Sequence, residues 1–255
     1  MDGNFINDSN YLDQHFLIDE KIIDLFIKSC NLNDKDVVIE IGPGQGTLTK
    51  KIAPKVKSLT VIEKDTRLKT YLDNIPNINV IYNNVLDTEI PMCDKIITAI
   101  PYSIIEPFIH KLIKTSFKEL YMIMGSTYID NVINKEINNL SLLTNTFFET
   151  QKLFKVLPES FNPKPKTLSY AVKITPKTSF EGLDLIFKYL YELDNKKIKN
   201  SLIEALIDLK RITKRKSKIL LEKFNIKNEI LEKQFSTISN NELKYLYEIL
   251  KKEGI

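Results

Sequence analysis

The sequence predicts an α/β protein: a doubly wound, mostly parallel sheet followed by a small all-helical domain. Short β-branched runs alternate with helical segments up to about residue 176, and beyond Pro176 the apolar residues follow helical spacing alone. A chain of 255 residues with 43% hydrophobic content can also bury a sizeable core. We therefore expect two domains, residues 1–177 and 178–255.

The first predicted element is an amphipathic helix that starts after Asp19, a residue type that caps helix N-termini well. Its apolar residues recur at helical spacing: Ile22, Ile23, Phe26, Ile27 and Cys30.

Five short apolar runs predict the strands of the sheet, and helical segments fit between most of them. These runs are VVIEI (37–41), LTVIE (59–63), INVIY (78–82), KIITAI (95–100) and ELYMIM (119–124). Strands that alternate with helices form parallel sheets with helices on both faces.

Two further strands are predicted on either side of a proline-rich connection. TNTFFETQKLFKVL (144–157) and TLSYAVKI (167–174) flank FNPKPK (161–166), and we expect them to form an antiparallel edge. After residue 178 the helical periodicity is carried by Leu183, Ile186, Phe187, Leu190, Ile198, Leu202, Leu206 and Leu209.

The charge of the chain is modest, +4, but it is unevenly distributed. Residues 196–218 carry nine basic and two acidic side chains. Such a run is typical either of a solvated helix face or of a surface that contacts RNA or DNA phosphates.

The two cysteines and the apolar stretches bear on location. Cys30 and Cys93 sit in apolar contexts and cannot form a disulfide framework, so reduced core thiols are expected. No apolar stretch approaches the roughly 20 residues that span a bilayer. We expect a cytoplasmic protein without a membrane span.

The strongest motif is VVIEIGPGQGTLTK, a strand that runs into Gly42, Gly44 and Gly46 and then a helix. Glycines at such a turn allow close approach of the backbone to a ligand and a positive φ. A dinucleotide fingerprint would have its third glycine at position 47, which is Thr47. The E-x-G-x-G-x-G form resembles instead the first motif of S-adenosylmethionine-dependent methyltransferases; a purely structural turn is the alternative.

An acidic residue, Glu63, ends the second predicted strand, 19 residues after Gly44. A carboxylate at this place can accept hydrogen bonds from both ribose hydroxyls of a nucleoside. Together with the glycine loop it favours a cofactor that contains adenosine over a solvated strand-end acid.

Several segments together resemble, in order and spacing, the ribosomal RNA adenine dimethyltransferases, small-subunit enzymes related to the erythromycin-resistance methyltransferases. The segments are QHFLID (14–19), IEIGPGQGTLT (39–49), VIEKD (61–65), IPYSI (100–104) and FNPKPKTLSYAV (161–172). The resemblance spans about residues 10–210, and KKIKNSL (196–202) is similar to the basic start of that family's C-terminal domain. It implies a Rossmann-like methyltransferase fold with S-adenosylmethionine as the cofactor.

The resemblance assigns a cofactor-binding role to matching positions. These are His15, Leu17, Gly42, Gly44, Glu63, Asn84 and Ala99. His15 and Leu17 would close over the cofactor, largely through their backbone; without the resemblance, Leu17 is a core residue and His15 a capping or surface residue.

The matching catalytic positions are Ile100, Pro101, Tyr102 and Phe161. The resemblance implies that Tyr102 and Phe161 sandwich a target adenine flipped out of its stack, whereas each ring taken alone is a candidate for the core. The backbone carbonyl of Ile100 would accept a hydrogen bond from the adenine amino group. No metal site is expected, because no His, Cys or carboxylate cluster has ligand spacing.

The sequence departs from the family pattern around this pocket. Ala99 stands where the family has Asn or Asp, whose oxygen helps draw the conjugated adenine amino group toward tetrahedral geometry. By analogy with losing one oxyanion-hole donor, its absence costs ~2.7–4 kcal/mol, or ~10²–10³ in rate. Asn84 replaces an Asp that contacts the cofactor's adenine amino group, Asp13 replaces a glycine, and Gly125-Ser126-Thr127 replaces a more polar segment.

We expect S-adenosylmethionine-dependent N6-dimethylation of adenines in small-subunit ribosomal RNA during ribosome biogenesis, by a monomer whose C-terminal domain binds RNA. The alternative is a catalytically impaired or inactive family member that serves as an rRNA-binding ribosome-assembly factor or another nucleic-acid-binding protein. A small-molecule methyltransferase is a third possibility, but it gives FNPKPK and the basic C-terminal helices no use.

Overall fold

A computed structural model gives the fold, and it describes residues 15–100 and 102–255 without the side chain of residue 102. Compactness divides the chain into two units: Met1–Asp130 with Thr150–Pro176, and Asn131–Glu149 with Lys177–Ile255. Each unit is described by itself below.

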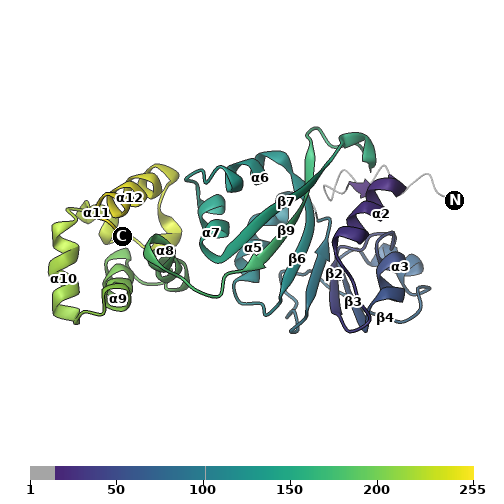
Figure 1. Cartoon of the computed structure of the whole chain (residues 1–255), viewed down its shortest axis with the longest axis horizontal. Helices are drawn as coiled ribbons and strands as arrows, with labels where there is room; N and C mark the ends of the chain where they lie inside the picture. Colours follow the sequence, from purple (N-terminus) through teal and green to yellow (C-terminus); the bar gives the residue numbers. More distant parts are fainter. Residues whose placement is uncertain (1–14, 101) are drawn as a thin grey trace. The chain divides into compact units, whose positions relative to one another are not determined.

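The first unit is built on a seven-stranded sheet with the order β4-β3-β2-β5-β6-β9-β7 (Figure 1). Its strands are β2 (Val37–Ile41), β3 (Ser58–Glu63), β4 (Ile78–Tyr82), β5 (Lys95–Thr98), β6 (Glu119–Gly125), β7 (Phe148–Val156) and β9 (Ser169–Pro176). Strands β4, β3, β2, β5 and β6 are parallel, and β9 runs antiparallel to β6. The predicted doubly wound sheet and its antiparallel edge are confirmed.

The strand order reverses at β2. The chain passes from β2 outward to β3 and β4, then returns to place β5 on the other side of β2. In open α/β sheets a ligand binds outside the carboxyl ends of the strands at such a switch point. The glycine loop follows β2 directly, so the topology itself indicates where to look for the site.

The helices of the first unit are α2 (Glu20–Ser29), α3 (Thr49–Ile52), α4 (Lys69–Leu72) and α5 (Ile105–Leu112), while α6 (Ser126–Ile133) spans the boundary at residue 130. The Asp19 carboxylate caps α2 as predicted, accepting from the backbone N–H groups of Lys21 and Ile22. The apolar face of α2 is buried with residues of β2 and β3 in one core cluster. Cys30 and Cys93 are both buried free thiols, as expected.

A two-stranded ladder, β1 (Phe16–Leu17) with β8 (Phe161–Asn162), joins the start of the described chain to the proline-rich connection. The sequence predicted FNPKPK only as a connection, because a two-residue strand leaves no periodicity to detect. The ladder is extended by the Ile18 N–H, which donates to the Ser160 carbonyl over 2.8 Å.

The second unit is helical, with α7 (Asn139–Phe147), α8 (Gly182–Glu192), α9 (Ile198–Lys210), α10 (Lys214–Lys223), α11 (Asn228–Leu231) and α12 (Asn240–Lys252). Its core gathers apolar side chains of α8, α9 and α12 with Leu142 of α7. The helices expected after residue 178 are therefore present, and 131–149 joins them. The boundary at 177/178 stays a prediction.

One predicted strand was wrong at its start. Residues 144–147 close α7 rather than open a strand, and β7 begins only at Phe148. The Asn138 side chain caps α7 by accepting from the Ser141 N–H, and the Thr144 hydroxyl donates back to the Leu140 carbonyl. The β-branched threonines that favoured a strand are thus accommodated in a helix whose Leu142 and Leu143 are buried. Among the residues the structure describes, no helix is long and apolar enough to cross a membrane.

Candidate functional site

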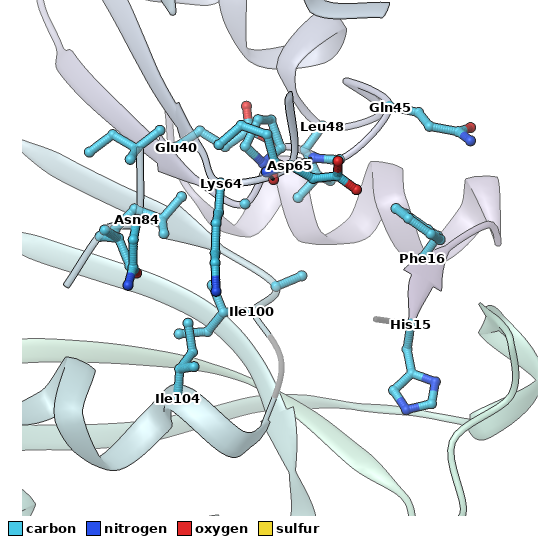
Figure 2. A pocket seen from close by; sticks show the side chains of 18 of the residues that line it. His15, Phe16, Glu40, Gln45, Leu48, Lys64, Asp65, Asn84, Ile100 and Ile104 are labelled. Carbon is cyan, nitrogen blue, oxygen red and sulfur yellow. Dashed lines mark hydrogen bonds between the residues drawn. The ribbon is translucent and has the colours of Figure 1, made fainter. Parts of the chain in front are cut away.

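A cavity of about 600 Å³ opens at the carboxyl ends of the central strands (Figure 2). Eight residues singled out from the sequence line it together: His15, Leu17, Gly42, Gly44, Glu63, Asn84, Ala99 and Ile100. They come from β1 and the residue before it, from the turn after β2, from the end of β3 and from the loops after β4 and β5. This size and position are typical of a small-molecule or cofactor site.

The glycine loop forms the floor of this cavity, and two of its glycines are required by close contacts. Gly44 has φ +58°, and a Cβ there would lie 3.0 Å from the Phe16 ring, which lines the same cavity. Gly46 has φ +79°, and a Cβ there would lie 2.5 Å from Ile75. Gly44 therefore allows β1 to pack against the loop, and Gly46 allows the loop to pack on the core.

Glu63 is fixed by the same loop. Its carboxylate accepts from the Gly44 N–H over 3.1 Å and from the Asp65 N–H over 2.8 Å, and the residue is 4% exposed. Burial raises the pKa of Glu63 above its ordinary value, and these two hydrogen bonds oppose the rise. The strand-end acid is thus a buried group at the cavity wall, as its sequence position suggested.

A second acid, Glu40 in β2, also lines the cavity; it is the acid of the E-x-G-x-G-x-G form, but the sequence assigned it no role of its own. Glu40 is 1% exposed, and its Oε2 atom has no hydrogen-bond partner among the described residues. Burial raises the pKa of Glu40 from 4.5 to about 8, with the Glu63 charge adding to the rise. The signal that was available is an acid inside the apolar strand VVIEI, where a carboxylate is costly unless it serves a ligand.

We predict that Glu40→Gln changes how stability depends on pH. A carboxyl whose pKa is raised in the folded state stabilises the fold fully below its unfolded pKa, and this contribution is lost as pH rises toward about 8. The variant has no such group, so its stability relative to the parent protein should rise between pH 5 and pH 8, by up to about 1.4 kcal/mol per pH unit. Urea unfolding of the ligand-free proteins measures this difference, and parallel pH profiles would contradict it.

Asn84 lies just beyond β4, and its side chain is already engaged. Its Oδ1 atom accepts from the Leu86 N–H over 3.1 Å, which leaves the amide nitrogen, a donor, as its other polar atom. Lys64 lines the cavity as well and adds a further donor (Figure 2). This end of the cavity therefore offers donors where an aspartate would offer an acceptor.

The loop after β5 carries the predicted catalytic positions. The strand ends at Thr98, whose hydroxyl donates to the Ile41 carbonyl over 2.8 Å. Ala99 and Ile100 follow the strand and line the cavity. Ala99 contributes only a methyl group there. Pro101 and the side chain of Tyr102 lie outside the described residues, as does Asp13.

Phe161, the other predicted base-stacking residue, does not line the cavity. It lies in β8 opposite Leu17, is 6% exposed and belongs to the core cluster of the first unit. The connection it begins does reach the site indirectly, because the Pro163 carbonyl lies 2.7 Å from Nδ1 of His15. The clamp of Tyr102 and Phe161 stays a prediction.

Metal ligation was not expected, and within 15–100 and 102–255 no group of His, Cys, Asp and Glu side chains is arranged to hold a metal ion.

Comparisons with known proteins agree over most of the chain. A family model described as ribosomal RNA adenine dimethylase matches residues 7–243. The probable ribosomal RNA small subunit methyltransferase A of Methanosphaera stadtmanae is 28% identical over 253 residues, which cover 93% of this chain and 91% of the relative. The protein of the same name from Methanococcus aeolicus is 31% identical over 264 residues, which cover 94% of this chain and 97% of the relative.

Solved structures give the same result for the fold. A dimethyladenosine transferase from Plasmodium falciparum superposes with a TM-score of 0.64 at 25% identity, covering 94% of this chain and 99% of that one. The 23S rRNA methyltransferase ErmE superposes with a TM-score of 0.59 at 23% identity, covering 92% and 99%. The second likeness concerns the fold alone.

Proposed function

Because this chain belongs to the ribosomal RNA adenine dimethylase family, we propose that it dimethylates N6 of adenines in the RNA of the small ribosomal subunit. It is an S-adenosylmethionine-dependent methyltransferase that acts on ribosomal RNA. The relatives named above as small-subunit methyltransferases support the choice of subunit. The observation that carries the proposal is that the glycine loop, Glu63 and Ile100 line one and the same cavity.

The residues that line this cavity fit S-adenosylmethionine. The loop at Gly42 and Gly44 would hold the methionine part. The Glu63 carboxylate, already oriented by the N–H groups of Gly44 and Asp65, would accept from the ribose hydroxyls. The unpartnered Glu40 Oε2 atom offers a further polar contact in the same cavity. When bound, the cofactor supplies an electrophilic methyl group on its sulfonium sulfur.

The chain must present the adenine amino group to that methyl. We propose that the Ile100 carbonyl accepts a hydrogen bond from the adenine amino group and so orients its nitrogen. The buried side chains of Ile41 and Ile100, which line the cavity, would exclude water there. Tyr102 and Phe161 are proposed to hold the extruded base. Ala99 adds no acceptor, so this chain orients the amino group with fewer contacts than the family pattern provides.

RNA contacts are proposed for the predicted C-terminal domain, residues 178–255, and for the connection 161–166. In that connection Lys164 and Lys166 are both exposed; Lys164 is paired with Glu159, whereas Lys166 has no ion pair among the described residues. A monomer in the cytoplasm is part of the proposal, and light scattering during size exclusion tests the oligomeric state.

Methyl transfer to isolated ribosomal subunits tests the function. With tritiated S-adenosylmethionine and subunits prepared from cells that lack adenine dimethylation, we expect label in small-subunit RNA, recovered as dimethyladenine. Label in the large subunit alone would overturn the choice of subunit. No label at stoichiometric protein concentration, alongside measurable binding of cofactor and RNA, would instead support the assembly-factor alternative.

We predict that Asn84→Asp raises cofactor affinity about 5- to 10-fold, because a hydrogen bond to a charged acceptor is stronger than one to a neutral group by roughly 1 kcal/mol. An aspartate keeps one oxygen on the Leu86 N–H and offers the second to the adenine amino group. Calorimetric titration with S-adenosylhomocysteine measures the gain. Asn83→Asp is the matched control, since it adds the same charge at a neighbouring cavity residue whose Oδ1 accepts from the Asn84 N–H; an equal gain there would contradict the prediction.

A further inference from the structure

One end of the cavity is lined by side chains that offer hydrogen-bond donors, and we call it the donor end. It is defined by four residues that line the cavity: Lys64, Asp65, Asn83 and Asn84. Strands β3 and β4 are parallel neighbours with Glu63 opposite Tyr82, so the loop after β4 begins beside the end of β3. Figure 2 shows the side chains of Lys64 and Asn84 pointing the same way from these two strand ends.

The side-chain oxygens of the donor end are already engaged. The Asn83 Oδ1 atom accepts from the Asn84 N–H over 2.8 Å, and the Asn84 Oδ1 atom accepts from the Leu86 N–H over 3.1 Å. The Asp65 carboxylate accepts from the backbone N–H, Nε and Nη2 of Arg67 at 2.8–3.1 Å. A ligand that brings a donor to these side chains therefore finds their oxygens occupied.

The side-chain nitrogens of the donor end are available to a ligand. The amide nitrogens of Asn83 and Asn84 and the Lys64 ammonium have no hydrogen-bond partner among the described residues. Turning the Asn84 amide round would set its NH₂ group against the Leu86 N–H, donor against donor, and leave that N–H without its acceptor. The orientation that presents the Asn84 nitrogen to the cavity is therefore the stable one.

The donor end is where the purine base of the proposed cofactor would lie. The glycine loop follows β2, Glu63 ends β3, and the donor end follows β3 and β4, in the sheet order β4-β3-β2. With the methionine part at the loop and the ribose at Glu63, the base extends over the end of β4. Adenine carries acceptors at its ring nitrogens and a donor only at its 6-amino group.

We propose that the donor end binds the base through acceptor nitrogens of the purine ring and provides no acceptor for the 6-amino group. Asn84 is the specificity-determining residue, because its amide is half-buried whereas Asn83 is exposed to water. The inference rests on the proposed function in that the cofactor is S-adenosylmethionine. It assigns a ligand class: purine nucleoside cofactors with or without a 6-amino group. A site that binds an N–H group of its ligand rejects analogues that lack it, and a site without that acceptor tolerates them.

Calorimetric titration with two ligands tests the inference: S-adenosylhomocysteine, and its analogue with hydrogen in place of the 6-amino group. For the parent protein we expect the two affinities to agree within about 2-fold. For Asn84→Asp we expect S-adenosylhomocysteine to bind about 5- to 10-fold more tightly than the analogue, because only the amino group gains an acceptor. Asn83→Asp is the matched control, since it adds the same charge in exposed surroundings and should leave the two affinities as close as in the parent.

Two further analogues test the contact that replaces recognition of the amino group. N1 and N7 lie on either side of position 6, so we expect S-adenosylhomocysteine with CH in place of N1 or N7 to bind the parent about 5- to 10-fold more weakly in at least one case. Full affinity for both ring analogues would overturn the inference, as would a parent protein that binds the analogue without the amino group more than about 5-fold more weakly. If methyl transfer persists in either case, the proposed function stands. If S-adenosylhomocysteine itself does not bind, the cofactor assignment fails together with the inference.

Discussion

Replacing Ala99 with asparagine is expected to raise kcat for methylation of ribosomal RNA by ~10²-fold, the largest gain we predict. The adenine amino nitrogen is conjugated with its ring and is a poor nucleophile until hydrogen-bond acceptors draw it toward tetrahedral geometry. In this chain Ile100 lines the cavity, but the neighbouring side chain, that of Ala99, is a methyl group. An asparagine oxygen at position 99 adds an acceptor that is used more strongly in the transition state than in the ground state, so it should act on kcat.

Single-turnover methyl transfer to unmodified small subunits measures this gain, and titration with S-adenosylhomocysteine checks that cofactor affinity changes little. Ala53→Asn is the matched control, because Ala53 and Ala99 are both half-buried and pack against the same core cluster, but only Ala99 lines the cavity. The control should show no gain.

A result that would contradict the prediction is an unchanged rate in Ala99→Asn together with loss of activity in Ser103→Ala. Ser103 lines the cavity from the turn after Ile100, and its hydroxyl has no hydrogen-bond partner in the part of the chain that is described. That outcome would identify Ser103 as the acceptor that replaces the missing side chain.

The sheet and most of the cofactor wall could be predicted from sequence because each rests on local signals. Strand β2 has the predicted bounds, since a β-branched run that ends in glycines leaves little choice of where the strand stops. The glycine loop and Glu63 could be assigned from their places at strand ends, whereas Asn84, Ala99 and Ile100 were assigned only by the family resemblance; they share one cavity because parallel strands bring their carboxyl ends to one edge of the sheet. Residues that follow different parallel strands in the sequence can therefore be predicted to lie near one another.

What could not be predicted depends on contacts between distant segments. The ladder of β1 with β8 joins residues about 145 apart, and neither two-residue strand has a pattern of its own. Glu40 belongs to the E-x-G-x-G-x-G form but was not placed in the site, because its burial and its orphaned Oε2 atom appear only in the structure. Ion pairs in the run 196–218 could not be predicted either. Lys197 and Lys199 pair with Glu232, which lies in a different part of the helical unit.

Replacing Glu63 with alanine is expected to lower cofactor affinity by ~10²-fold or more, the largest loss we predict. Two hydrogen bonds from ribose hydroxyls to a carboxylate would be lost, each worth about 1.5–3 kcal/mol. The substitution also leaves the Gly44 and Asp65 N–H groups without the acceptor that now orients the glycine loop. Titration with S-adenosylhomocysteine measures the loss. Glu119→Gln is a suitable control, because Glu119 is a carboxylate of the same sheet, in β6, that does not line the cavity.

The parent protein offers a test of the same residue without mutation. Only the ionised carboxylate accepts from both ribose hydroxyls, so affinity for S-adenosylhomocysteine should fall as acidification protonates Glu63. Burial raises the pKa of Glu63, so this fall should begin at a higher pH than for an exposed glutamate. The same raised pKa means that protonation stabilises the ligand-free fold, and stability and affinity should therefore change in opposite directions as the pH falls. An affinity that stays constant while Glu63 titrates, followed by NMR of its carboxyl carbon, would show that the carboxylate does not hold the ribose.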